Sequence, residues 1–282
     1  MNRVEPSFGY YYYPDENKIE SMDKISYYGL FSTFTLLLST ITLIHRDYDK
    51  LPTKINLSNA LLKFKNEKDK DLYSELFTIN NDVTIPNVRA IGPDPHHEIY
   101  DNKLIEELYP YIQRYFNLSP ELKKIKCDIL NKYNLNESKY NSIIYRGTDQ
   151  FTDRGGFMSV NCVAYEKLYR DIIKNDNEKN ELIIQSDEKR VTEHFTRTLN
   201  AKFINETDIG VIGETDAPIP KNNVNFWLKN YVATLHLISQ SNKLITYTGN
   251  SGFFTVLFRG NLKNVYQEQT FKLDKNIFFK NN

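Results

Sequence analysis

The chain has 282 residues, of which 40% are hydrophobic and 26% are charged, and its 36 basic residues balance its 36 acidic ones. This composition is typical of a globular protein that forms one large domain or two smaller ones, and it excludes a wholly disordered or fibrous chain. A net charge of +0 provides no overall attraction to nucleic acid or to an anionic membrane, so any anion site must be local.

The amino-terminal region predicts a long buried helix. An aromatic run over residues 8–13 is expected to supply core and sheet residues. Gly29 then precedes an apolar segment over residues 30–44, a pattern typical of a helix that packs on a sheet. That segment is shorter than the roughly 20 apolar residues of a membrane span, and the start of the chain has no signal-peptide pattern. We therefore expect a cytoplasmic protein without a membrane span.

Shorter elements are expected farther along the first half. Residues 54–64 and 83–91 have the pattern of short ordered pieces. Helical spacing over residues 102–133 is interrupted at Ser119 and Pro120. A serine N-cap followed by proline at the first helical position is a signal for the start of a helix, so two helices are predicted there.

The second half alternates strands with helices, which predicts a parallel sheet. In such sheets ligands bind at the loops that follow the carboxyl ends of the strands. Three loops with the sequences RGTDQ, SDE and TGNSG follow predicted strands. The predicted strands span residues 141–145, 181–185 and 244–247, and the predicted helices span 163–173, 190–199, 225–239 and a segment after 252.

Arg146 is the principal candidate for an anion ligand. It directly follows the first of these strands, and its planar, permanently charged guanidinium can bind a diphosphate in two places at once. Gly147 permits a close approach of the ligand, while Thr148 and Asp149 can orient the arginine or bond the ligand. The alternative is a structural ion pair between Arg146 and Asp149.

The loop over residues 248–252 is a second candidate. It leads directly into an apolar helix, so its backbone N–H groups form a helix N-terminus, which is a favourable place for an anion. Ser251 is predicted to be the N-cap, and Gly249 and Gly252 are expected to leave room for a phosphate. The alternative is a tight turn with a capped helix.

Acidic residues follow the strand at 181–185. Residues 186–188 are either the N-cap and first-turn acids of the next helix or a contact to a nucleotide base. A carboxylate at a strand end can accept two hydrogen bonds from the edge of guanine, which would determine the choice of nucleotide.

In combination, these three loops resemble a known arrangement. Their order and sequences are similar, over about residues 141–261, to the C-terminal donor domain of the fucosyltransferase-like GT-B glycosyltransferases. The H-x-R-x-x-D motif of that family corresponds to residues 145–149 with one spacing adjustment. Tyr145 or Ile144 stands in place of its histidine, and Gly147 stands in place of a second arginine. The first half resembles the family only through residues 29–32.

The resemblance implies an α/β fold of GT-B type, in which two Rossmann-like domains face a cleft. Residues 1–135 would form the acceptor-side domain and residues 136–282 the donor domain. The implied activity is inverting, metal-independent transfer of a sugar to an acceptor hydroxyl of a glycan or other molecule, with fucose from GDP-fucose favoured. The alternatives are another GDP- or UDP-sugar, a catalytically inactive nucleotide-sugar or glycan-binding protein, and a purely structural protein.

The resemblance also implies roles for individual residues. Arg146 would bind the β-phosphate of the donor and Asp187 would contact the base. A general base for the acceptor hydroxyl is expected among Asp94, His96, His97 and Glu98, with Asp94 and His97 as the candidates. The remaining residues expected to bind substrate are Gly29, Leu30, Phe31, Tyr145, Gly147, Thr148, Asp149, Ser186, Glu188, Thr248, Gly249, Asn250, Ser251, Gly252 and Phe253.

No metal or other cofactor is expected besides the nucleotide-sugar donor, which is a co-substrate. No D-x-D motif lies near a predicted strand end. Cys127 and Cys162 lack the spacing of metal ligands and are expected to be buried free thiols.

Overall fold

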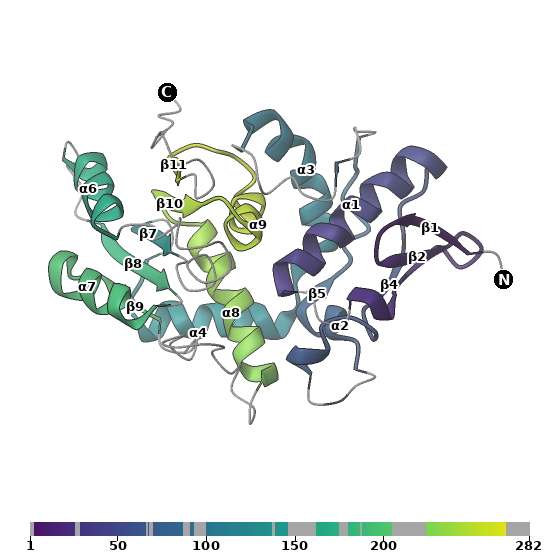
Figure 1. The fold of residues 1–282 in the computed structure, drawn as a ribbon, viewed down its shortest axis with the longest axis horizontal. Helices are drawn as coiled ribbons and strands as arrows, with labels where there is room; N and C mark the ends of the chain where they lie inside the picture. The colour runs from purple at the N-terminus through teal and green to yellow at the C-terminus, as the bar shows by residue number, and fades with distance from the viewer. Residues whose placement is uncertain are drawn as a thin grey trace, which may run out of the picture.

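A computed structural model places a five-stranded parallel sheet at one end of the molecule and a smaller mixed sheet at the other, with helices between and around them (Figure 1). The expected α/β class is therefore confirmed. The residues described are 3–25, 29–65, 67, 70–86, 91–92, 100–136, 139–145, 162–174, 180–186, 188–204 and 224–268.

The smaller sheet packs against the long helix α1 (Leu30–Tyr48). In its second strand, Tyr10 and Tyr12 are buried and alternate with half-buried tyrosines, which is the period of two that a strand requires. The hydroxyl of Tyr10 donates to the carbonyl of Thr33 on α1 at 2.8 Å. Strand order is β1-β2-β3-β4, with only the β3–β4 pair parallel, and the strands are β1 (Val4–Ser7), β2 (Tyr10–Tyr13), β3 (Lys18–Ser21) and β4 (Lys54–Asn56).

The predicted break between two helices is confirmed. The hydroxyl of Ser119 accepts from the N–H of Leu122 at 3.3 Å, and Pro120 occupies the first helical position. The elements of this region are the 3-10 turns η1 (Asp23–Ile25) and η2 (Leu62–Phe64), the helices α2 (Leu72–Leu76), α3 (Asn102–Tyr115) and α4 (Pro120–Lys132), and the paired strands β5 (Phe77–Thr78) and β6 (Asn117–Leu118).

The second half forms the parallel sheet, in the order β11-β10-β7-β8-β9. We number the five strands of this half 1 to 5 along the chain, so that β7 is strand 1 and β11 is strand 5. From β9 to β11 their order across the sheet is then 3-2-1-4-5, which is the order of a doubly wound nucleotide-binding sheet. The predicted strands and helices are confirmed, and two strands, β9 and β11, were not predicted. The elements are β7 (Tyr140–Tyr145), α6 (Cys162–Ile173), β8 (Glu181–Ser186), α7 (Lys189–Leu199), β9 (Lys202–Phe203), α8 (Val224–Ser239), β10 (Leu244–Tyr247), α9 (Asn250–Arg259) and β11 (Val265–Glu268).

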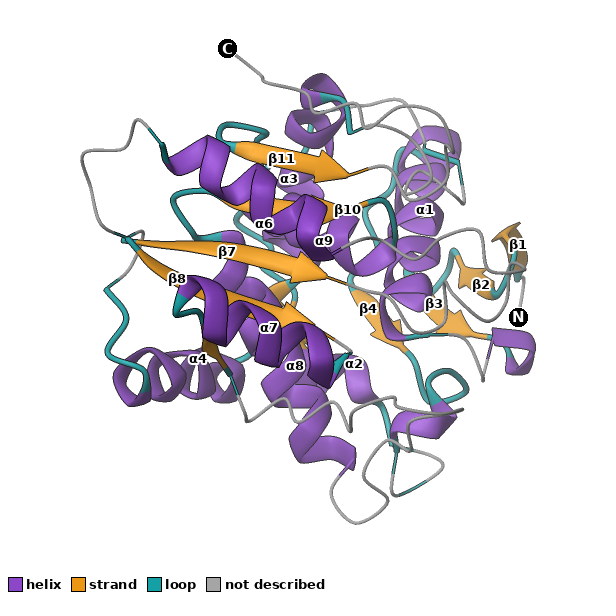
Figure 2. Cartoon of the chain, turned by 60° about the vertical axis from the view of Figure 1, so that its left-hand side comes forward, coloured by secondary structure: helices purple, strands orange, loops and turns teal. Residues whose placement is uncertain are grey.

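Helices cover both faces of the parallel sheet. Figure 2 shows α6 and α7 over one face, where Tyr165 and Phe195 pack against Ile143 and Ile184. The opposite face packs against α8 and α9, and its apolar residues belong to a larger cluster. Strands that are buried on both faces are expected to contain a continuous apolar run, as Ile143–Tyr145 of β7 and Leu182–Ile184 of β8 do.

That larger apolar cluster continues into the first half of the chain. Phe254 of α9 contacts Phe31 and Phe34 of α1, with ring centroids 5.4 and 5.9 Å apart, and Phe116 at 5.2 Å. In addition, α4 packs extensively against α8. The two halves therefore share one hydrophobic core.

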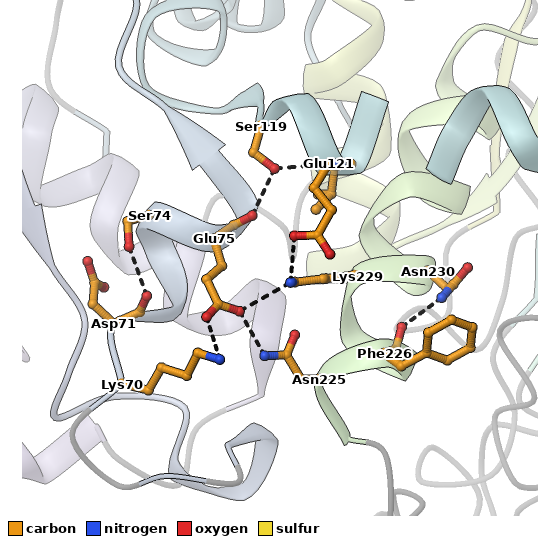
Figure 3. A network of polar contacts seen from close by, with 11 residues as sticks. Lys70, Asp71, Ser74, Glu75, Ser119, Glu121, Asn225, Phe226, Lys229 and Asn230 are labelled. Atoms are coloured by element: carbon orange, nitrogen blue, oxygen red, sulfur yellow. Dashed lines mark hydrogen bonds and ion pairs between the residues drawn. The ribbon is translucent and has the colours of Figure 1, made fainter. Parts of the chain in front are cut away.

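A polar network also joins the halves (Figure 3). Lys229 of α8 lies 2.7 Å from a carboxylate oxygen of Glu121 on α4 and 3.4 Å from one of Glu75 on α2. Glu75 also binds Lys70 at 2.6 Å and accepts from the amide of Asn225 at 2.7 Å. Because the Lys229 side chain is only 14% exposed, this cation is held in a partly dehydrated position among its partners.

Trp227 and His236 lie on α8 in packed surroundings. The Trp227 ring stacks with Phe64, at a centroid distance of 6.1 Å, and with Tyr231 at 5.1 Å, and the half-buried side chain packs against the core. The pKa of His236 is lowered to about 4, first because burial disfavours the charged ring and then because nearby lysines of α4 repel it. Its Nδ1 is buried and makes no hydrogen bond.

One expectation for the cysteines is wrong. Cys127 is exposed because it lies on the outer face of α4, and it is a free thiol. The side chain of Cys162 lies outside the described residues. Among the residues that the structure describes, no helix combines the length and the apolar content that crossing a membrane requires.

Candidate functional site

Three neighbouring strands of the parallel sheet, β8, β7 and β10, end at the same level. Tyr145 at the end of β7 pairs with Ser186 at the end of β8. On the other side of β7, Ile245 of β10 pairs with Ile143, and the same register places Tyr247 level with Tyr145. The prediction that the RGTDQ, SDE and TGNSG loops follow neighbouring parallel strands at one edge of the sheet is therefore confirmed.

The topological switch point of the sheet lies between β7 and β10. The chain leaves β7 toward α6, which covers one face, and leaves β10 toward α9, which covers the opposite face. In open α/β sheets, ligands bind where neighbouring strands diverge in this way, outside their carboxyl ends. The two loops at this point are those that begin at residues 146 and 248.

The glycine loop after β10 leads directly into α9. The helix begins at Asn250, and its N-cap is Gly249, which has no side chain to accept a first-turn N–H. The partial positive charge of a helix N-terminus is therefore not offset by the cap. The prediction of Ser251 as the N-cap is wrong: it lies inside the first turn, where its hydroxyl accepts from Tyr231 at 3.3 Å.

The glycine at position 252 is required by close packing. A Cβ there would overlap the carbonyl oxygen of Tyr247 and would lie 2.7 Å from the hydroxyl of Thr246. A Cβ at Gly249 would lie 2.6 Å from the Tyr247 ring. The space beside these two glycines is thus filled by the end of β10, and α9 starts in direct contact with the strand.

The N-terminus of α1 lies beside that of α9. Asn250 accepts a hydrogen bond from Thr35 at 2.8 Å and donates one to Ser32 at 3.0 Å. Like α9, α1 has a glycine N-cap, Gly29. Two positive helix ends, one from each half of the chain, therefore lie close together next to the switch point.

The other predicted contacts in this region are mainly buried. Leu30, Phe31 and Phe253 belong to the hydrophobic core, so their side chains serve packing. The hydroxyl of Thr248 is also buried and accepts from Gln267 at 3.2 Å. A ligand at this edge would thus meet backbone groups of the loop rather than these side chains.

Ser186 and Glu188, the two described residues of the SDE segment, lie at the start of α7. The hydroxyl of Ser186 accepts from the N–H of Glu188 at 3.0 Å, and Glu188 is the N-cap residue of α7. The segment therefore leads into a helix, as one of the two interpretations expected, but the N-cap is Glu188 and the first turn contains no acidic residue. The base contact stays a prediction. The Glu188 side chain is buried.

Several predicted site residues lie outside the described part of the chain. They are Arg146, Gly147, Thr148, Asp149, Asp187, Asp94 and His97, together with the alternatives His96 and Glu98. Their described neighbours Tyr145, Ser186 and Tyr100 lie at the carboxyl edge of the sheet. Among the described residues, no group of His, Cys, Asp or Glu side chains is arranged to hold a metal ion.

Tyr100 is a residue of this region that the sequence did not indicate. Its hydroxyl donates to the carbonyl of Tyr247 at 2.8 Å, although the two residues are 147 positions apart in the chain. One tyrosine among 20 carries no pattern that would distinguish it. The only available signal is its position directly after the loop that contains Asp94 and His97.

Comparisons with known proteins do not assign the chain to a family. No protein-family model matches it, and none of the curated proteins compared with it is significantly similar in sequence. The functional argument therefore depends on the strand order and on the loops at the carboxyl edge.

Proposed function

We propose that the carboxyl edge between β7 and β10 binds the diphosphate of a nucleotide sugar and that the protein is a GT-B-like glycosyltransferase. The observation that carries this proposal is the strand order, which puts the switch point between β7 and β10. Arg146 directly follows β7 in the sequence, and the glycine loop follows β10. A diphosphate at that point would meet a bidentate cation from one loop and a helix N-terminus from the other.

The chemistry of transfer explains why these groups would be useful. An acceptor hydroxyl attacks the anomeric carbon, the bond from that carbon to the diphosphate breaks, and negative charge develops on the leaving group. Arg146 and the N-terminus of α9 would stabilise that charge, so the proposed transfer is metal-independent. A base removes the proton of the acceptor hydroxyl.

The candidates for the base are Asp94 and His97. His97 is three residues from Tyr100 in the chain, so their Cα atoms can be at most about 11 Å apart. Tyr100 is in turn bonded to the end of β10. Chain connectivity thus supports a base supplied by the first half to a donor held by the second half.

The nucleotide and the sugar follow from the resemblance. GDP-fucose is favoured, with Asp187 as the contact to guanine and Gly29 at the N-terminus of α1 on the acceptor side. A different GDP- or UDP-sugar in the same site is the alternative donor.

A thermal-shift panel with GDP, UDP, GDP-fucose and UDP-glucose tests the proposal. A ligand that binds only the folded state raises the melting temperature, and GDP and GDP-fucose are expected to do so most strongly. Donor consumption with a glycan acceptor then distinguishes an active enzyme from an inactive binding protein. No shift with any of the four at millimolar concentration would overturn the proposed site.

Arg146→Ala is the matching variant. Loss of its charge-assisted hydrogen bonds is expected to weaken GDP binding by about tenfold to a hundredfold, with little change in stability. The control is Arg170→Ala, which removes an exposed arginine that pairs with Glu166 on α6. Strong destabilisation by Arg146→Ala, without a selective loss of GDP affinity, would instead indicate an internal ion pair.

A further inference from the structure

Tyr100 connects the first half of the chain to the glycine loop. Its hydroxyl donates to the carbonyl of Tyr247 at 2.8 Å and also lies 3.4 Å from the carbonyl of Gly249. The side chain is 6% exposed, and its ring packs on Phe253 with centroids 5.6 Å apart. One buried hydroxyl thus contacts two backbone carbonyls of the segment that leads into α9.

Gln267 of β11 holds the same segment from the other side. Its amide oxygen accepts from the backbone N–H of Tyr100 at 2.9 Å, and its amide nitrogen donates to the Thr248 hydroxyl at 3.2 Å. Tyr100 and Gln267 therefore enclose residues 247–249 in a closed set of hydrogen bonds, which we call the Tyr100–Gln267 clasp. Both side chains are buried, so water competes little for these bonds.

The clasp determines the direction of two backbone N–H groups. A peptide unit is planar and trans, so its N–H points away from its own carbonyl. The carbonyls of Tyr247 and Gly249 are directed at the Tyr100 hydroxyl. The N–H groups of Thr248 and Asn250 must therefore point away from Tyr100, at the start of α9.

We propose that Tyr100 is a positioning residue for the diphosphate site, acting through the backbone of the glycine loop without touching the ligand itself. This inference depends on the proposed function of that loop. The hydroxyl fixes the N–H groups of Thr248 and Asn250 in the direction that a phosphate needs.

Tyr100→Phe removes the hydroxyl and keeps the ring against Phe253. The matched control is Tyr73→Phe, because the buried hydroxyl of Tyr73 also donates to a backbone carbonyl, that of Tyr115 at 2.6 Å, away from the sheet edge. Each variant loses one buried tyrosine hydrogen bond of the same kind, so the two are expected to lose similar stability.

Calorimetric titration of the wild type and both variants with GDP and with UDP separates positioning from general stability. We expect Tyr100→Phe to weaken binding of the preferred nucleotide about tenfold and Tyr73→Phe to leave it unchanged within about twofold. Gln267→Met, which removes the other arm of the clasp, is expected to act in the same direction. Amide exchange at residues 248–252 without nucleotide should be faster only in the clasp variants.

The outcomes distinguish the two proposals. Wild-type binding of GDP or UDP with equal affinities for Tyr100→Phe and Tyr73→Phe, and with equal amide exchange, would overturn the role of Tyr100 and leave the proposed function intact. No binding of either nucleotide by the wild type would overturn both. Selective loss in Tyr100→Phe and Gln267→Met supports the clasp.

Discussion

Replacement of Gly252 with alanine tests the close contact between α9 and β10. The added methyl group would overlap the Tyr247 carbonyl and lie 2.7 Å from the Thr246 hydroxyl and 3.1 Å from the Tyr100 hydroxyl. A displacement of about 1 Å is needed to restore an ordinary contact, and the overlapping oxygen is backbone that cannot rotate away. Overpacking of this kind costs about 1–3 kcal/mol, which the higher helix propensity of alanine offsets by at most about 1 kcal/mol.

The expected result is a net loss of about 1–2 kcal/mol in the free energy of unfolding, or roughly 2–6 °C in melting temperature. Urea unfolding followed by circular dichroism measures it. Gly29→Ala is the control, since the nearest atom to its Cβ, the Ser32 hydroxyl, is 3.4 Å away. Gly29 is the N-cap of α1, where alanine is less favourable than glycine, so we expect that variant to lose less than about 1 kcal/mol. Equal stability of both variants and the wild type would refute the packing argument and leave the glycine to be explained by the ligand.

Two further predictions concern the ionisable side chains of Lys229 and His236 on α8. Lys229→Met is expected to lower the unfolding free energy by about 1–2 kcal/mol, because Glu75 and Glu121 lose a partly buried cation, whereas Lys103→Met in an exposed pair should cost less than about 0.5 kcal/mol. Equal losses in urea unfolding at pH 7 would contradict this. Because the pKa of His236 is lowered to about 4, the unfolded chain binds a proton that the folded ring does not, so stability falls as the pH falls from about 6.5 to about 4. In His236→Leu the unfolding free energy should fall by about 1–3 kcal/mol less than in the wild type between pH 6.5 and pH 4. A pH profile of stability parallel to that of the wild type would contradict the lowered pKa of His236.

Elements with local signals were predictable from the sequence. Helix α4 begins at Ser119 and Pro120 because both residue types have a specific chemical role at a helix start. Strand β7 ends in the apolar run Ile143–Tyr145 and is followed by a polar sequence, and β10 and α9 are separated by a glycine turn. Such signals lie within a few residues, so they survive without knowledge of the tertiary structure.

Elements stabilised by distant partners were not predictable. Strand β4 has one buried residue, Ile55, and β9 has two half-buried residues, so neither contains a recognisable period. The prediction for Ser251 is wrong because its partner is Tyr231 of α8, and the contact of Tyr100 with Tyr247 spans slightly more than half of the chain. The position of the glycine loop could therefore be predicted from the sequence, whereas the residues that hold it could not.

The shared core restricts how the proposed site can work. Phe254 of α9 packs against Phe31 and Phe34 of α1, and burial of one phenylalanine ring is worth about 4 kcal/mol at about 25 cal/mol per Å². Separation of α1 from α9 would expose these rings and break both bonds of Asn250. The two helix N-termini must therefore stay together while a ligand binds and leaves. A positive site that does not reorganise during the reaction is the kind that stabilises developing charge most effectively.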